Sequence, residues 1–182
     1  DLVNNGTFVG GSGDNVLEFT GDVSGAGSFT GNVAFSGSYS PGSSPALVTH
    51  GDTTFAASNV LTMELGGLVR GSEYDAIDAN SLVLGGTLSI RLLDLGGGQF
   101  VPTPGATFDL LSATLISGTF GSYDFAALGP TLTWSIAYLT DAVGTTDVVR
   151  LSVTAVPEPE TWILMLAGLG LVGALTRRKM QR

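Results

Sequence analysis

The chain has 182 residues and no cysteine, so it has room for one ordinary domain and can form neither disulfides nor a thiol nucleophile. Residues 1–156 carry 14 acidic side chains against three arginines and no lysine, which gives this part a net charge of −11. Because it has no basic patch, we expect no nucleic acid as a partner.

The glycine content predicts β-structure. The chain has 27 glycines, about twice the usual share. Its hydrophobic content of 43% is too high for a disordered chain. Many short apolar segments separated by Gly-rich turns are typical of an all-β fold, either a sandwich, a barrel or a solenoid.

A loose repeat occupies the first fifty residues. Gly6-Thr7-Phe8, Gly27-Ser28-Phe29 and Gly37-Ser38-Tyr39 each place an aromatic residue after a glycine and a hydroxyl residue. The first two aromatics are 21 residues apart, close to one rung of a β-solenoid, in which stacked rungs bury a shared core. The repeat therefore indicates a solenoid, with a β-sandwich as the alternative.

Alternating apolar residues predict strands along the rest of the body, after a turn at Ser40–Pro45 where Pro and Gly fix the bend. Val60–Leu65 alternates, and Thr131–Leu139 is the clearest strand, with Trp134 and Tyr138 on its apolar face. Further strands are expected at Tyr74–Ile77, Ser81–Leu84, Leu88–Leu92, Phe108–Leu111 and Val149–Val153. No segment before Thr161 has a sustained helical period.

The order of these segments resembles the C-terminal end of autotransporter-type passenger domains, over about residues 30–155. The segments that carry the resemblance are Phe35–Pro45, Leu61–Gly67, Gly71–Ile77, Leu84–Leu88 and Ile116–Phe120. The resemblance implies a right-handed parallel β-helix with a capping β-region. It also implies a structural or adhesin-like surface domain and no particular chemistry.

Catalytic and metal-binding interpretations find little support in the sequence. His50 is the only histidine, so His-rich metal sites are excluded, and we expect it to be a surface turn residue. The pairs Asp75/Asp78 and Asp94/Asp109 could serve as glycosidase carboxylates, but nothing marks either pair, and Asp75 is expected to stabilise a turn at a strand edge.

The segment Gly10–Asn15 is similar to one calcium-roll repeat, but it occurs once and its Asp is one position early, so a glycine turn is expected. We therefore predict no catalytic residue, no metal ligand and no cofactor.

The last 27 residues have a different organisation. Pro157 and Pro159 fix the backbone as extended, and an apolar run from Trp162 to Leu175 follows. This run has 14 residues, or about 21 Å as a helix, against the roughly 30 Å of a bilayer core. A C-terminal helix packed on the body is therefore the alternative to a membrane segment. The basic cluster at Arg177–Lys179 favours the membrane segment because clustered positive charges stay in the cytoplasm.

This arrangement resembles the PEP-CTERM sorting signal of exported bacterial proteins. The resemblance implies that Pro157, Glu158 and Pro159 are recognised by an exosortase, a membrane-embedded cysteine protease or transpeptidase. It implies a membrane anchor made of Trp162, Ile163, Leu164, Met165, Leu166, Leu169, Leu171, Val172 and Leu175. The cytoplasmic stop would be Arg177, Arg178, Lys179 and Arg182. Glu160 departs from the family, which more often has a small residue there.

These observations divide the chain into a Gly-rich β-body, residues 1–155, and a sorting signal, residues 156–182. The signal has its motif at 157–159, one transmembrane-type helix at 161–176 and the basic stop at 177–182. Because the chain begins at Asp1 without Met or a signal peptide, we expect its natural start to lie upstream.

The expected function is that of a non-enzymatic, exported surface or extracellular-matrix protein. It would be anchored transiently in the inner membrane with its body outside the cytoplasm, then processed to the cell surface or medium. Exopolysaccharide is a further expected partner. The alternative is a carbohydrate-binding or carbohydrate-cleaving module, and a third possibility is a soluble β-domain onto which the C-terminal helix packs.

Overall fold

A computed structural model describes residues 1–42 and 44–156. This part of the chain consists of strands, turns and irregular segments and contains no helix. The strands are β1 (Leu2–Val3), β2 (Thr7–Val9), β3 (Leu17–Phe19), β4 (Val23–Gly25), β5 (Ser28–Phe35), β6 (Ser38–Pro41), β7 (Leu47–Phe55), β8 (Val60–Leu65), β9 (Ala76–Leu84), β10 (Thr87–Leu92), β11 (Thr107–Gly118), β12 (Ser122–Phe125), β13 (Leu132–Val143) and β14 (Thr146–Ala155). The predicted all-β class is confirmed.

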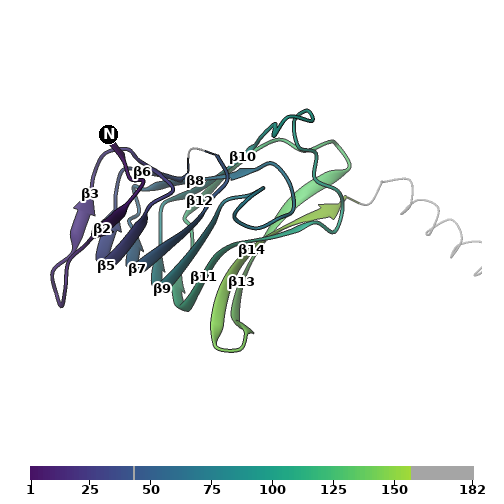
Figure 1. Ribbon diagram of the computed structural model, residues 1–182. Coiled ribbons are helices and arrows are strands. Elements are labelled where there is room, and N and C mark those ends of the chain that lie inside the picture. Colours follow the sequence, from purple (N-terminus) through teal and green to yellow (C-terminus); the bar gives the residue numbers. More distant parts are fainter. Residues whose placement is uncertain (43, 157–182) are drawn as a thin grey trace, which may run out of the picture.

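The strands form two sheets that face each other (Figure 1). The smaller sheet has the order β1-β4-β6-β8-β10-β12, and all its neighbours are parallel. The larger sheet has the order β13-β14-β11-β9-β7-β5-β2, with β3 also paired to β5. From β4 to β13 the chain alternates between the sheets, and each strand from β5 to β12 lies beside the strand two places earlier in the sequence. The exception is the antiparallel end made by β11, β14 and β13.

The 21-residue spacing appears in the pairing of the first strands of the larger sheet. Phe8 in β2 pairs with Phe29 in β5, and Phe29 pairs with His50 in β7, again 21 residues on. Tyr39, the third aromatic of the predicted repeat, lies in β6 of the smaller sheet, so it is not a further member of this ladder. The sequence therefore contains the repeat with His50 as its third member.

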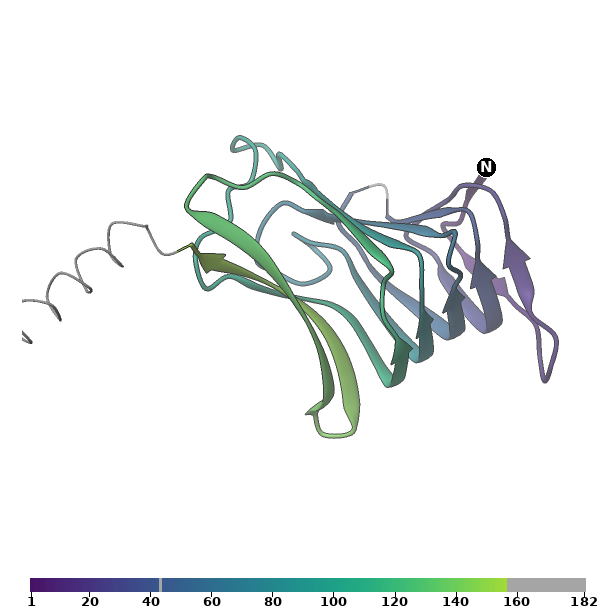
Figure 2. The same ribbon diagram turned by 180° about the vertical axis from the view of Figure 1, so that it is seen from behind.

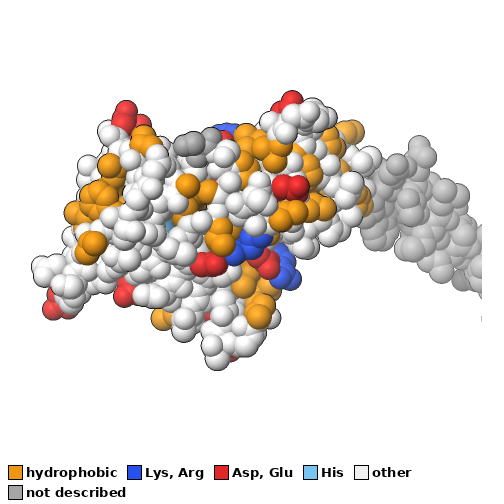
Figure 3. All heavy atoms as spheres, viewed as in Figure 1, with side chains coloured by type: hydrophobic (Ala, Val, Ile, Leu, Met, Phe, Trp, Pro, Cys, Tyr) orange, Lys and Arg blue, Asp and Glu red, His pale blue; other side chains and the backbone are white. Residues whose placement is uncertain are grey.

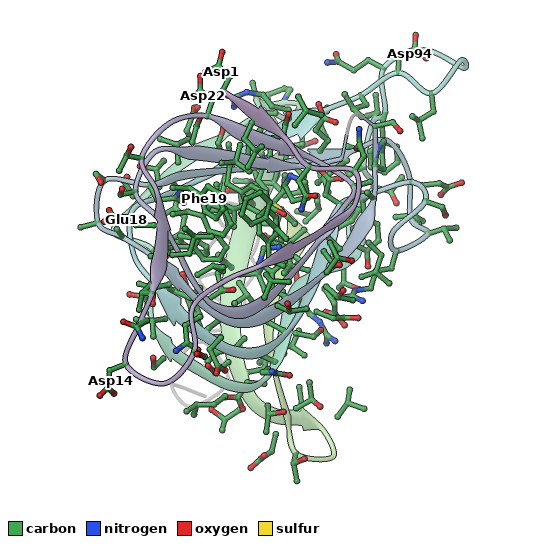
Figure 4. The ribbon with its side chains drawn as sticks, turned by 60° about the vertical axis from the view of Figure 1, so that its left-hand side comes forward. Asp1, Asp14, Glu18, Phe19, Asp22 and Asp94 are labelled. Carbon is green, nitrogen blue, oxygen red and sulfur yellow. The ribbon has the colours of Figure 1, made fainter. Side chains whose placement is uncertain are left out.

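Aromatic side chains fill the space between the sheets at the N-terminal half of the body. Phe35 is fully buried, and its ring lies 5.3 Å from Phe19, 4.5 Å from Tyr39 and 5.7 Å from Phe55, measured between centroids. In the view towards the N-terminal end, Phe19 points into this interior, whereas the labelled acidic side chains near it point outward (Figure 4). Such a stack removes several large rings from water at once, which is the main stabilising term of the fold.

Most predicted strands are present, and their apolar faces are the buried ones. In β8 the side chains of Leu61, Met63 and Leu65 are buried, as the alternation predicts. The two short strands expected at Tyr74–Ile77 and Ser81–Leu84 are one continuous strand, β9, preceded by Tyr74 and Asp75. The segment expected at Phe108–Leu111 belongs to the longer β11. In β10, which contains the segment expected at Leu88–Leu92, Ser89 is buried together with Leu88 and Ile90.

A tight corner connects β9 to β10. Gly86 adopts a positive φ of 69°, and a Cβ there would meet the carbonyl oxygen of Asn59. The amide of Thr87 donates to that carbonyl at 2.8 Å, and the amide of Gly121 donates to Gly86 O, also at 2.8 Å. Glycine is required at this corner because successive turns of the chain stack here with backbone in contact.

The C-terminal end of the body is an antiparallel cap. β11 pairs in parallel with β9 on one side and in antiparallel with β14 on the other, and β13 completes the edge (Figure 2). Residues 1–42 and 44–156 contain no helix long and apolar enough to cross a membrane. The predicted helix at 161–176 lies outside the described residues.

We expect the aromatic stack to dominate stability. The substitution Phe35→Ala should lower the free energy of unfolding by about 3–5 kcal/mol, because it removes a fully buried ring and leaves a cavity. Val9→Ala, at a side chain that is 74% exposed, is the control and should change it by less than about 0.5 kcal/mol. Urea unfolding of the full chain measures both. Equal midpoints for the two variants would contradict the assignment of the stack as the main stabilising element.

Candidate functional site

The described body ends directly before the Pro-Glu-Pro sequence. In the β13–β14 pair, Leu132 lies opposite Ala155, the last residue of β14. One more backbone hydrogen bond follows, from Val156 N–H to the Thr131 carbonyl at 2.8 Å. Val156, directly before Pro157, therefore makes the last hydrogen bond of the described chain. The residues predicted for the sorting motif, the membrane anchor and the stop all lie outside the described part of the chain.

Ion pairs hold the strand from which the chain leaves. Arg150 in β14 donates from Nε and Nη2 to the two carboxylate oxygens of Asp109 in β11, at 2.5 and 2.9 Å. Arg70 donates from Nε to the backbone carbonyl of Asp109 at 2.9 Å and from Nη2 to Asp78 in β9 at 2.7 Å. These bonds tie β9, β11 and β14 together across their ladder. A bidentate Arg–carboxylate pair also fixes orientation, which a simple charge contact does not.

The loops before β13 are fixed by two side chains of that strand. Trp134 Nε1 donates to the Ala126 carbonyl at 2.8 Å, and the Tyr138 hydroxyl accepts from the Phe120 amide at 3.0 Å. Burial raises the pKa of Tyr138, and the Tyr123 hydroxyl at 3.1 Å acts in the same direction. Tyr138 therefore stays protonated. Hydrogen bonds between β13 and the two loops that precede it therefore hold the cap together.

The candidate carboxylate pairs have separate structural roles. Asp75 is completely buried, and its two oxygens accept from the Ala46 and Glu64 amides, both at 2.8 Å. The expectation of a turn at a strand edge was therefore wrong for Asp75, because its carboxylate joins backbone from two distant segments. Burial raises its pKa to about 7, against the opposing effect of the two amide donors. Such a group stabilises the fold most at low pH, and that contribution is lost as the pH rises through 7.

The other carboxylates of those pairs are also engaged. Asp78 and Asp109 bind Arg70 and Arg150, as described above. Asp94 accepts from the amides of Gly96 and Gly98 in its own loop, and these donors lower its pKa. Each of these acids has a structural partner of its own.

His50 was expected at a surface turn, and this expectation was wrong. It lies in the middle of β7, is only 6% exposed, and its Nε2 is 2.9 Å from the Tyr39 hydroxyl. Its Nδ1 is 3.3 Å from the Thr53 hydroxyl, and the Phe29 ring packs against it edge-on. Burial lowers the pKa of His50 to about 3, so the ring is neutral at physiological pH. A surface position was inferred from its polarity, whereas the 8–29–50 spacing would have placed it in the core ladder.

The Gly10–Asn15 segment forms a turn, as predicted, with Gly13 at a positive φ of 59°. Within residues 1–42 and 44–156, no three His, Asp or Glu side chains are grouped so that they could hold a metal ion. Hollows on the outer face of β9 and β11 are lined by small side chains such as Ala79, Ser112 and Thr114.

Residues 155–179 match the PEP-CTERM protein-sorting motif. The match starts at Ala155, the last residue of β14, so the motif adjoins the folded body without a spacer. This motif implies a secreted protein that is sorted by an exosortase and anchored in the membrane before processing. A search of curated proteins found no match to the chain.

The buried imidazole predicts a distinct pH dependence. His50 is neutral in the folded state and has its ordinary pKa of about 6.5 when unfolded, so its stabilising contribution is present above pH 6.5 and is lost as the pH falls towards about 3. Below pH 6 the free energy of unfolding should fall by about 1 kcal/mol per pH unit from this group. His50→Gln keeps a polar group beside Tyr39 and removes this slope. Parallel curves for the two proteins between pH 7 and 4 would contradict the prediction, since the chain has no other histidine.

Proposed function

We propose that the chain is a non-enzymatic, exported surface or extracellular-matrix protein whose β-body is a solenoid with an antiparallel cap. The observation that carries the proposal is the PEP-CTERM motif joined directly to the end of β14. A folded body followed directly by a sorting motif fits a protein that is exported, anchored and then processed.

The solenoid interpretation is supported by the strand order. From β4 to β13 the chain gives one strand to each sheet in turn, and from β4 to β12 neighbouring strands in each sheet pair in parallel. β-Sandwiches are built from antiparallel sheets, so the parallel pairing favours a solenoid over the sandwich alternative. A right-handed sense and a relationship to autotransporter passenger domains remain hypotheses that rest on the order of sequence motifs.

A structural or adhesin-like role is supported by how the ionisable groups are used. The one histidine is buried in the core, and each of the three arginines of residues 1–156 forms an ion pair with an aspartate. Groups engaged in this way hold strands together and are poorly placed to transfer protons to a substrate. Association with exopolysaccharide is a further hypothesis, drawn from the family resemblance.

The sorting route assigns roles to the C-terminal residues. Pro157, Glu158 and Pro159 form the recognition element for the exosortase, residues 161–176 form the anchor, and residues 177–182 form the cytoplasmic stop. The body is then held outside the cytoplasm at the inner membrane. After processing it reaches the cell surface or the medium.

The carbohydrate-binding alternative would be favoured by a cluster of exposed aromatic rings beside carboxylates. Among the exposed large apolar side chains of residues 1–42 and 44–156, Tyr123 is the one aromatic, next to Asp124 in β12. A single exposed ring offers only one position on which a sugar could stack, whereas the alternative calls for a cluster of rings. We therefore retain the structural role as the leading proposal.

Processing in the native host tests the sorting proposal. The mature protein should lose the residues after the Pro157–Pro159 region, and intact-mass measurement of the surface or secreted fraction detects this loss. Pro157→Ala/Pro159→Ala should abolish it by removing the backbone restriction of the motif.

The control is Pro104→Ala/Pro130→Ala, which makes the same chemical change at two exposed prolines of the body and should leave processing intact. An unprocessed C-terminus on a wild-type protein that remains in the cytoplasm would contradict the sorting function.

A further inference from the structure

The length of chain between body and anchor limits how far the body can stand from the membrane. Five residues separate Val156, the last described residue, from Trp162, where the apolar run begins. Fully extended, the chain from Val156 to Trp162 spans at most about 22 Å. If the run from Trp162 is the anchor, as proposed above, the end of the body that surrounds Val156 must lie close to the bilayer surface. The inference below rests on that proposed anchoring.

Two loops are bonded directly to the residues where the chain leaves. The loop of residues 93–106, which follows β10, is joined to β14 by Gly105 N–H to Val153 O and Val153 N–H to Ala106 O, at 2.8 and 2.9 Å. The loop of residues 126–131, which follows β12, ends at Thr131, whose carbonyl accepts from Val156. Because β10 and β12 are parallel neighbours, these loops emerge on the same side of the body.

A third loop, residues 66–75, follows β8, the other parallel neighbour of β10. It touches the loop of 93–106, since the side chain of Leu95 packs directly over Gly66. Its tip is held by the Glu73 carboxylate, which accepts from the amides of Leu68 and Val69 at 2.8 and 3.0 Å. This bonding turns the one acid of the tip towards the backbone and leaves two aliphatic side chains facing solvent.

These loops present an aliphatic surface, which we call the exit face and define by Leu68, Val69, Leu95 and Val101. All four side chains are exposed, from 49% for Leu95 to 74% for Val101. Figure 3 shows hydrophobic side chains gathered over the end of the body where the described chain ends. The loops of 93–106 and 126–131 contain a single charged residue, Asp94, in a body that is otherwise strongly acidic.

We propose that the exit face contacts the outer surface of the membrane in which the chain is anchored, with its aliphatic side chains in the headgroup region. Exposed Leu and Val side chains gain free energy when they enter the boundary between headgroups and acyl chains. The proposed anchor keeps the body beside the membrane at a high effective concentration, so that a weak contact is enough to hold the exit face on the surface. The net charge of −11 disfavours binding of the free body to anionic lipid, so the contact depends on the anchor.

Asp94 fits this orientation. It lies at the tip of its loop (Figure 4), and its carboxylate is already bonded to the amides of Gly96 and Gly98. A carboxylate that accepts from two amides can lie at the polar level of the interface while the adjacent Leu95 reaches deeper. The depth of insertion is then limited to the loop tips, and the β-body stays in water.

Single-cysteine labelling tests the contact cleanly, because the chain has no cysteine. The full chain carrying Val101→Cys or Val69→Cys is labelled with a polarity-sensitive fluorophore and reconstituted in phosphatidylethanolamine–phosphatidylglycerol vesicles that contain nitroxide-labelled lipid. The matched controls are Val9→Cys and Val16→Cys at the N-terminal end. Val9 is as exposed as Val101, at 74%, and Val16 at 56% matches Val69 at 55%.

Labels at positions 101 and 69 should be quenched by the lipid nitroxides several-fold more than labels at positions 9 and 16. Equal, weak quenching at all four positions in protein that floats with the vesicles would overturn the membrane contact while leaving the anchoring intact. Protein that does not float with the vesicles would show that the proposed anchor itself fails, and the contact with it. Crosslinking of position 101 to a co-reconstituted exosortase without lipid quenching would assign the exit face to that protein instead.

Discussion

The packing of aromatic rings between the two sheets is the interaction on which the rest of the body depends. Phe8, Phe29 and His50 form one ladder in the larger sheet, and Phe19, Phe35 and Phe55 form a second. Tyr39 reaches the same interior from the smaller sheet. The rings come from strands that are neighbours in the sheets, so they are buried only when these strands pair. Close pairing also brings backbone against backbone at corners such as Gly86, where a side chain would not fit.

The parallel pairing of the larger sheet ends where the chain reverses direction, and β13 becomes the edge strand at this end. β11 accepts a parallel neighbour on one side and an antiparallel one on the other, with a register shift between Asp109 and Leu111. The Arg150–Asp109 pair lies beside this irregularity and fixes the strand that follows. The antiparallel cap thus ends the parallel stack and positions the point where the chain departs.

The sequence predicts the local features of this fold well and the long-range ones poorly. Strands such as β8 and β14 are evident because their buried residues alternate, and this pattern depends only on neighbours along the chain. The burial of His50 and Asp75 depends on partners that the sequence does not place. His50 is satisfied by Tyr39 from the other sheet, and Asp75 by amides 29 and 11 residues away. A polar residue considered alone is expected at the surface. The free-energy cost of burying it is offset only when the folded chain brings hydrogen-bond partners to it.

The sorting signal was recognisable because it is local and linear, whereas its relation to the body is a property of the structure. The β13–β14 ladder reaches Val156, and neither Pro157 nor Pro159 has an amide hydrogen with which a sheet could be extended. The last described ladder hydrogen bond, from Val156, is therefore followed by a proline, which has no amide hydrogen with which to donate the next one. The loops that receive the last hydrogen bonds of β14 contain a single charged residue, Asp94. The cap thus ends the parallel pairing of the larger sheet, and its strand β14 leads directly into the motif.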